Sequence, residues 1–341
     1  MSMEVIKVDS PINEVTIFAK KKKPNPSIVY NTYWRFAAER QEIFFKRFER
    51  ETPPWTSDVI LKLFKFTNAY RATDRVSQYL IKKVIYNGDQ KPSEVFFRIL
   101  LFKLFNKIET WELIARHIGK ISSDTYRYKE YDNILGRSMQ KGESIYSGAY
   151  MMASGRNAFG YALKHQNHLK LIETMFKDRL YERILSFSKM EELFNALKEY
   201  ATIGPFLAYQ FATDINYSNL TQFSEMEFVK AGPGARDGIK KCFLDFGDYT
   251  EEDIIKMMAD NQHVEFDRLE IKFKNLWGRP LQLIDCQNIF CEVDKYSRVA
   301  HPEITGISDR KRIKQKFSPT SLIPIDYYFP PKWKIKVKVS E

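Results

Sequence analysis

The spacing of apolar residues along the chain predicts a mainly helical protein. Trp34, Ala37, Phe44 and Phe48 recur with the period of a buried helical stripe, so a helix is expected from Asn31 onward. A pair of prolines followed by Thr and Asp then ends this helix and begins another. Further helices are expected over residues 58–85, 93–106, 109–118, 122–140, 167–187 and 189–200.

Period-two alternation, which is typical of strands, is confined to the end of the chain. Trp333, Ile335, Val337 and Val339 alternate with lysines, which predicts one strand with a basic face. No internal repeat and no low-complexity linker divides the sequence. We therefore expect a basic arm over residues 1–30, a helical catalytic domain over 31–300 and a basic extension over 301–341. The helical part is expected to be a single domain or two closely interleaved helical lobes.

Charge and composition narrow the function classes. The chain has 54 Lys and Arg against 43 Asp and Glu, a net charge of +11, which favours a polyanionic partner such as nucleic acid or an anionic membrane surface. No apolar run approaches the roughly 20 residues of a spanning helix, so no membrane partner is expected. The three cysteines have neither a pairing framework nor a zinc spacing, and reduced, buried thiols are expected.

The first stretch that could carry chemistry begins at Lys65. On a helix, Arg71 and Arg75 would lie four residues apart and share a face with Asp74, so the carboxylate could hold one guanidinium while the other binds an anion. Lys65 and Asn68 add further hydrogen-bonding groups. A surface ladder of ion pairs is the alternative interpretation.

A second stretch predicts a hairpin of two helices. The turn contains Gly204, and Pro205 begins the second helix, where its missing N–H is tolerated. In a helix-hairpin-helix, such a turn, here Ile203 to Phe206, binds a DNA phosphate through backbone N–H groups. Any hairpin of helices shares this layout. Asp214 follows on the second helix.

A third stretch has two glycines around a proline. Gly232 and Gly234 could form a turn whose N–H groups converge on a phosphate or pyrophosphate. The helix that follows would place Arg236 and Lys240 on one face. A glycine-rich helix start without a ligand is an equal alternative. The phosphate loop of nucleotide kinases, Gly-x-x-x-x-Gly-Lys-Ser/Thr, does not occur in the chain.

The fourth stretch, residues 281–298, is predicted to be one helix. Its buried stripe consists of Leu283, Cys286, Phe290 and Val293. Asp285, Asn288, Glu292 and Lys295 fall on the opposite side. A solvated face would explain this pattern, but a carboxylate, an amide and a lysine on adjacent turns could also orient an amine or share a proton.

Together these stretches resemble the alpha-glutamyl/putrescinyl thymine pyrophosphorylases, phage and eukaryotic DNA base-hypermodification proteins also described as amino acid:DNA transferases. Their helical domain is named after its occurrence with 5-hydroxymethyluracil DNA kinases. The resemblance extends from about residue 33 to about residue 298. The matching residues are 65–68 with 74–76, 203–210 with Asp214, 232–236, and 291–296.

The resemblance implies a mainly α, helix-hairpin-helix DNA-glycosylase-like fold, with few short strands near the C-terminus. It implies that a pyrophosphate on the methyl carbon of a modified thymine in double-stranded DNA is replaced by an amino acid or polyamine. No cofactor is implied, and assistance by a divalent metal stays open. A 5-hydroxymethyluracil DNA kinase is a candidate partner. The expected location is the cytoplasm of a phage-infected host, or the nucleus of a eukaryote.

The site residues follow as hypotheses. Pyrophosphate departure needs cations and the amine needs a base. The phosphate-binding candidates are Lys65, Asn68, Arg71, Arg75, Gly232, Gly234, Arg236 and Lys240. The catalytic candidates are Asp214, Glu227, Glu292, Asp294 and Lys295. The DNA-binding candidates are Ile203, Gly204, Pro205 and Phe206.

Two other functions stay open. A glycosylase of this fold would excise the modified thymine, but the position of its working aspartate falls here on Glu225 and Glu227, which argues against excision. A non-catalytic module would bind modified DNA and present it to a kinase, with a steep dependence on salt.

Overall fold

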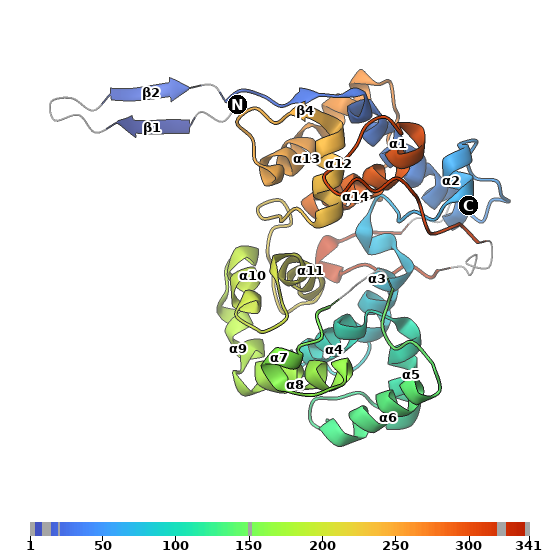
Figure 1. Cartoon of the computed structure of the whole chain (residues 1–341), viewed down its shortest axis with the longest axis vertical. Helices are drawn as coiled ribbons and strands as arrows, with labels where there is room; N and C mark the ends of the chain where they lie inside the picture. The colour runs from blue at the N-terminus through green and yellow to red at the C-terminus, as the bar shows by residue number, and fades with distance from the viewer. Residues whose placement is uncertain (1–3, 9–14, 20, 149–151, 319–324, 338–341) are drawn as a thin grey trace. The chain divides into compact units, whose positions relative to one another are not determined.

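The computed structural model describes the chain except residues 1–3, 9–14, 20, 149–151, 319–324 and 338–341. It is mainly helical, which confirms the predicted fold class (Figure 1). The chain forms two compact units. Unit 1 contains residues 1–69, 231–275 and 281–321, and unit 2 contains residues 70–230, 276–280 and 322–341.

Unit 1 is built around a helix from its last segment. Its elements are β1 (Glu4–Val8), β2 (Val15–Ala19), β3 (Asn25–Pro26), α1 (Ile28–Phe48), α2 (Val59–Leu63), α12 (Pro233–Cys242), β4 (Phe243–Asp245), α13 (Glu251–Arg268) and α14 (Leu283–Ala300). The helix α14 packs against α1, α12 and α13. The ring of Tyr33 lies 4.6 Å from that of Phe290, and the ring of Trp34 lies 5.1 Å from that of Phe266. These aromatic contacts join α1 to α13 and α14.

The contact between α12 and α14 is unusually close. A Cβ atom at Gly238 would lie 2.0 Å from the carbonyl oxygen of Phe290, so only glycine fits. At Gly234 a Cβ atom would lie 3.1 Å from the Cys291 Sγ. The glycines of this stretch therefore serve helix packing.

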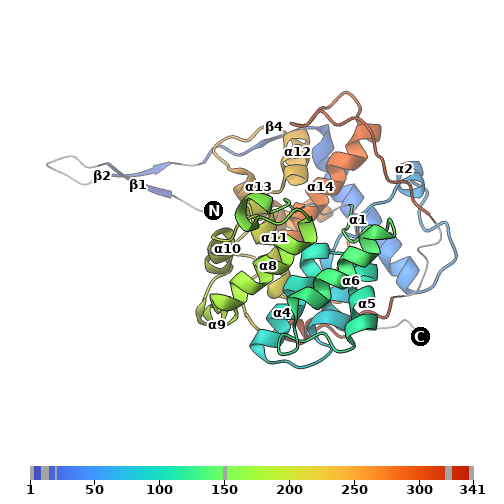
Figure 2. The ribbon, with the colours of Figure 1, turned by 60° about the horizontal axis from the view of Figure 1, so that its bottom comes forward.

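Unit 2 surrounds a central buried helix. Its elements are η1 (Arg71–Thr73), α3 (Arg75–Tyr79), η2 (Leu80–Ile85), α4 (Pro92–Phe105), α5 (Ile108–Ile118), α6 (Tyr128–Gln140), α7 (Arg156–Phe159), α8 (Lys164–Lys177), α9 (Leu180–Arg183), η3 (Ile184–Ser186), α10 (Met190–Lys198), α11 (Pro205–Ile215) and η5 (Pro331–Trp333). Nearly every residue of α4 is buried, and η2, α5, α8, α9 and α11 pack around it. Figure 2 shows α6 and α8 side by side in this unit.

Several predicted helices are confirmed with shifted ends. The first begins at Ile28 rather than Asn31, because Ser27 caps it by accepting a hydrogen bond from the Val29 N–H. The last predicted helix is α14, and its four apolar stripe residues are fully buried. The three cysteines lie within the described residues and are free, as predicted. Cys242 and Cys286 are buried, as predicted, whereas Cys291 is only half-buried.

The prediction of one helix over residues 58–85 is wrong. The helix α2 ends at Leu63, Phe64 is extended, and its backbone pairs with Lys316. Asp74 is also extended and precedes α3. Arg71 and Arg75 therefore do not share a helical face.

The predicted C-terminal strand is also wrong over its described part. Residues 331–333 form the 3-10 turn η5, and Lys334 has a φ of 52°, which interrupts an extended strand. The ring of Trp333 packs against Tyr217 and Phe329 instead of joining a sheet. Residues 338 and 339 of this prediction lie outside the described residues. The strands are found instead in the predicted N-terminal arm and at residues 243–245.

Candidate functional site

A buried cluster of charges lies inside unit 2. The Arg71 Nη2 lies 2.7 Å from the Asp214 Oδ1, and the Lys103 Nζ lies 2.6 Å from the Asp214 Oδ2. These side chains are 11%, 1% and 3% exposed respectively. They come from η1, α11 and α4, so one carboxylate joins three elements of the unit.

Burial and neighbouring charges shift the pKa values of Lys103 and Asp214 in opposite directions. Burial lowers the pKa of Lys103 to about 8, against the opposing attraction of Asp214. Burial also raises the pKa of Asp214, but Arg71 and Lys103 outweigh it and hold that pKa below its ordinary value. The carboxylate is therefore ionised between two cations.

The cluster continues through aromatic side chains. The Arg71 Nη1 donates to the Tyr217 hydroxyl at 3.0 Å, and the ring of Tyr217 lies 5.5 Å from that of Trp333. The Arg279 guanidinium lies 3.9 Å from the centre of the Trp333 ring and pairs with Glu225 at 2.7 Å. Sequence reasoning missed Arg279 and Trp333 as partners, because no local pattern links them to Glu225.

The predicted hairpin of helices is present in unit 2 as α10, a turn and α11. Gly204 is the N-cap of α11 and Pro205 its first residue. Within the turn, Thr202 adopts the left-handed backbone conformation, with a φ of 73°. Gly204, Pro205 and Phe206 are exposed, whereas Ile203 is buried in the core. Three of the four predicted DNA-binding residues therefore lie on the surface.

The first and fourth predicted stretches meet in unit 1. The Glu292 Oε2 accepts a hydrogen bond from the Thr67 N–H at 2.9 Å and lies 2.7 Å from the Lys295 Nζ. The Asn288 Nδ2 donates to the Thr67 Oγ1 at 3.0 Å and to the Asn68 carbonyl at 3.3 Å. We call Thr67, Asn68, Asn288, Glu292 and Lys295 the Glu292 site.

The Glu292 site combines shielding with access. The side chains of Glu292 and Lys295 are 11% and 18% exposed, so the pair lies at the edge of the interior. Lys295 also lies over the ring of Phe66, at 4.6 Å. Such a carboxylate and ammonium pair can exchange a proton with a ligand that approaches from solvent.

Asp294 belongs to a separate ionic cluster in unit 1. Its Oδ1 lies 3.1 Å from the Lys241 Nζ, and its Oδ2 pairs with Arg298 and, at 3.5 Å, with Arg310. Arg310 also pairs with Asp237 at 2.7 Å. This cluster joins α12 and α14 to the segment around residue 310.

The other predicted cations lie on surfaces. Arg236, at the start of α12, is 54% exposed by its side chain and pairs with Glu251 at 2.9 Å. Lys240 and Lys65 are exposed. Arg75 pairs with Glu109 at 3.5 Å in unit 2, and both side chains are more than half exposed.

The remaining predicted residues are also placed. Gly232 is the N-cap of α12. Glu227 is exposed, two residues after Glu225, which pairs with Arg279. Within the described ranges, no three His, Cys, Asp or Glu side chains are grouped so that they could bind a metal. Across the same ranges, every helix is too short or too polar to cross a membrane.

Comparisons with known proteins place the chain in a family. The family model described as "5-hmdU DNA kinase, helical domain" matches residues 27–306. A 5-hmdU DNA kinase of Bacillus phage SP10 is 25% identical over 288 residues, which are 79% of this chain and 45% of that protein. The chain therefore spans less than half the length of this relative. No solved structure matches it. Because the family model covers most of the sequence, the chain belongs to the family of the helical domain of 5-hmdU DNA kinases.

Proposed function

We propose that this protein completes a base modification in double-stranded DNA. It replaces a pyrophosphate on the methyl carbon of a modified thymine with an amine from an amino acid or a polyamine. Its family and the named phage kinase support a thymine modified at that carbon. The chain has no Gly-x-x-x-x-Gly-Lys-Ser/Thr loop, which favours a step other than phosphorylation by a P-loop kinase.

The Glu292 site is the observation that carries this proposal. An amine arrives as an ammonium and must lose a proton before its nitrogen can attack carbon. Glu292 is a carboxylate at the edge of the interior, and it is held in place by the Thr67 N–H and Lys295. We assign the proton transfer to Glu292. Lys295 pairs with this carboxylate at 2.7 Å and offers a positive charge to the departing group.

The proposed reaction is a displacement at the exocyclic methylene carbon of the base. Glu292 removes one proton from the ammonium, the free amine nitrogen forms a bond to the exocyclic methylene carbon, and the bond from that carbon to the pyrophosphate oxygen breaks. Inorganic pyrophosphate leaves with the electron pair, and the product is a secondary ammonium on the base. The proton on Glu292 passes to solvent or to the pyrophosphate.

The surface cations and the turn before α11 supply contacts to phosphates. We assign Arg236, Lys240 and Lys65 to the pyrophosphate, because they are exposed and positively charged. The exposed turn at Gly204 and Phe206 is assigned to the DNA backbone, since a helix N-terminus favours a phosphate. Asp214 is not assigned a proton transfer, because its carboxylate is already paired with two buried cations. It positions the side chains of Arg71 and Lys103 in unit 2.

The test uses duplex DNA that carries 5-pyrophosphomethyl-uracil. The full chain is incubated with this duplex and isotopically labelled amino acids and polyamines, and the DNA is then digested to nucleosides for mass spectrometry. We expect a nucleoside that carries the label, together with released pyrophosphate. A duplex with 5-hydroxymethyluracil is the matched control and should give no product, since hydroxide is a poor leaving group.

The same measurement separates the alternatives. Free modified base and abasic sites would identify a glycosylase and refute transfer. Unchanged nucleosides, with duplex binding that weakens steeply with salt, would identify a non-catalytic binding module.

A further inference from the structure

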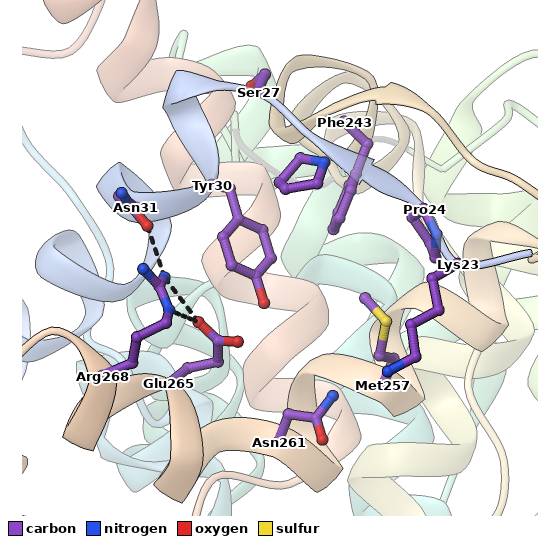
Figure 3. Close-up of a pocket in the computed structure, with 11 residues that line it drawn as sticks. Lys23, Pro24, Ser27, Tyr30, Asn31, Phe243, Met257, Asn261, Glu265 and Arg268 are labelled. Carbon is purple, nitrogen blue, oxygen red and sulfur yellow. Dashed lines mark hydrogen bonds and ion pairs between the residues drawn. The ribbon is translucent and has the colours of Figure 1, made fainter. Parts of the chain in front are cut away.

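Unit 1 contains a pocket that none of the residues assigned above lines. It has a volume of about 450 Å³ and lies between β3, the start of α1, β4 and α13. Figure 3 shows Tyr30 and Phe243 pointing into it, with Met257 and Asn261 facing them from α13. The pocket is thus distinct from the Glu292 site in its residues.

One part of the pocket is aromatic and apolar. The rings of Tyr30 and Phe243 lie 5.4 Å apart with an angle of 66° between their planes. Met257 adds a thioether beside them. Flat ring faces and a polarisable sulfur favour a planar heterocycle, because aromatic rings stack and pack edge to face with one another.

The positive charges that line the pocket outnumber the negative charges. Arg268 is matched within the pocket, since it pairs with Glu265 at 2.8 Å and donates to the Asn31 Oδ1 at 2.6 Å. Lys23 lies on the opposite side (Figure 3), and it has no ion-pair partner among the described residues. Its neighbours in the lysine run are paired, Lys21 with Asp253 and Lys22 with Asp245. The pocket therefore offers one uncompensated positive charge to an anionic ligand.

We propose that this pocket binds a nucleotide. The base packs against the ring of Tyr30, which Phe243 supports from behind, the Asn261 amide forms hydrogen bonds with the edge of the base, and Lys23 pairs with the phosphate. The volume falls within the range of about 300–1,000 Å³ that is typical of small-molecule sites. A free amine would not match, because Lys23 repels a cation.

The test measures binding to the full chain by isothermal titration calorimetry, with thymidine monophosphate and thymidine as probes. Lys23→Ala should weaken binding of the monophosphate about tenfold and leave thymidine nearly unaffected, because only the phosphate contact is lost. Asn261→Ala should weaken both probes, because both carry the base. Lys23 and Asn261 are exposed, so neither substitution disturbs the core. Lys272→Ala, an exposed lysine of unit 1 outside the pocket, is the control and should change neither affinity.

The source of the nucleotide is tested by competition. A single-stranded thymidylate oligonucleotide that displaces the monophosphate supports a nucleotide of a DNA strand as the ligand. Retention of the monophosphate against this competitor supports a free nucleotide. The proposal is overturned if the monophosphate shows no saturable binding, or if Lys23→Ala and Lys272→Ala weaken it equally. The binding measurement uses no amine and no pyrophosphate. Its outcome therefore does not depend on whether the protein catalyses amine transfer.

Discussion

The Lys103 ammonium lies 2.6 Å from the Asp214 carboxylate in the interior of unit 2, where the two side chains are 3% and 1% exposed. Arg71 approaches the same carboxylate from its other oxygen. Buried charges of this kind are stable only as a set, because each would be poorly solvated alone. One carboxylate therefore balances two cations. Loss of the carboxylate should destabilise the protein more than loss of either cation.

Replacement of Asp214 should destabilise the protein more than replacement of Lys103. Asp214→Asn leaves two buried cations without their carboxylate and should lower the free energy of unfolding by about 3–5 kcal/mol. Lys103→Met leaves Asp214 paired with Arg71, so its effect should be smaller. Urea denaturation followed by circular dichroism measures both. Equal losses would show that the two cations do not share the carboxylate.

The stability contributed at Lys103 should depend on pH in the alkaline range. Burial lowers the pKa of Lys103 from 10.5 to about 8 in the folded protein. Between these values the unfolded chain binds more protons at this residue than the folded chain, so the free energy of unfolding rises with pH. Relative to Lys103→Met, the wild-type protein should gain on the order of 1–3 kcal/mol from pH 8 to pH 10.5. Urea denaturation across this range tests it, and a constant difference would contradict the lowered pKa.

Two glycine substitutions should have opposite effects. Gly238→Ala forces a Cβ atom to within 2.0 Å of the Phe290 carbonyl oxygen, so it should destabilise the protein by about 3 kcal/mol or more. Gly136 lies inside α6 with no atom within 4 Å of its added Cβ, so Gly136→Ala should stabilise by about 0.5–1 kcal/mol. Thermal unfolding of the two variants shows whether each substitution raises or lowers the stability. A neutral Gly238→Ala would mean that α12 and α14 separate without loss.

The Glu292 site gives a prediction about activity. Glu292→Gln keeps an oxygen that can accept the Thr67 N–H but removes the base, so amine transfer should fall by about 100-fold or more. The melting temperature and the affinity for DNA should stay close to wild type. Glu303→Gln changes a carboxylate that is 66% exposed and serves as the control. A single-turnover rate that matches wild type would remove Glu292 from the mechanism.

Strong local periodicity allowed α14 to be predicted from the sequence. Leu283, Cys286, Phe290 and Val293 are all fully buried in the structure. The opposite side, however, is not a uniform solvated face. Glu292 and Lys295 contact the segment at Thr67 or its neighbour Phe66, more than 200 residues earlier in the chain. Periodicity shows that such a face exists but does not identify its partner.

Other parts of the fold depend on contacts that a local pattern does not contain. Arg71 begins the short 3-10 turn η1 and pairs with Asp214, which is 143 residues away in sequence. At the C-terminus, alternation of lysines and apolar residues predicts a strand, but the packing of Trp333 on Tyr217 prevails. Tertiary packing overrides weak local preference in both places.

The start of α13 has a clear signal in the local sequence. The helix α13 begins with a capping box, in which Thr250 accepts from the Asp253 N–H and Asp253 accepts from the Thr250 N–H. The sequence Thr-Glu-Glu-Asp carries this pattern and three acidic residues in the first turn. Its recognition would have predicted the helix that supplies Met257 and Asn261 to the pocket of unit 1.

The discontinuous sequence of unit 1 has a consequence during synthesis. Its first helix, α1, is complete about 185 residues before its partner α12 begins to emerge, and α14 follows later still. At translation rates of roughly 5–20 residues per second, the rings of Tyr33 and Trp34 wait roughly 10–50 s for their partners Phe290 and Phe266. During that interval the apolar face of α1 is exposed to chaperones that bind nascent chains. The yield of folded protein should therefore depend on the amount of these chaperones, and not only on the free energy of unfolding of the finished protein.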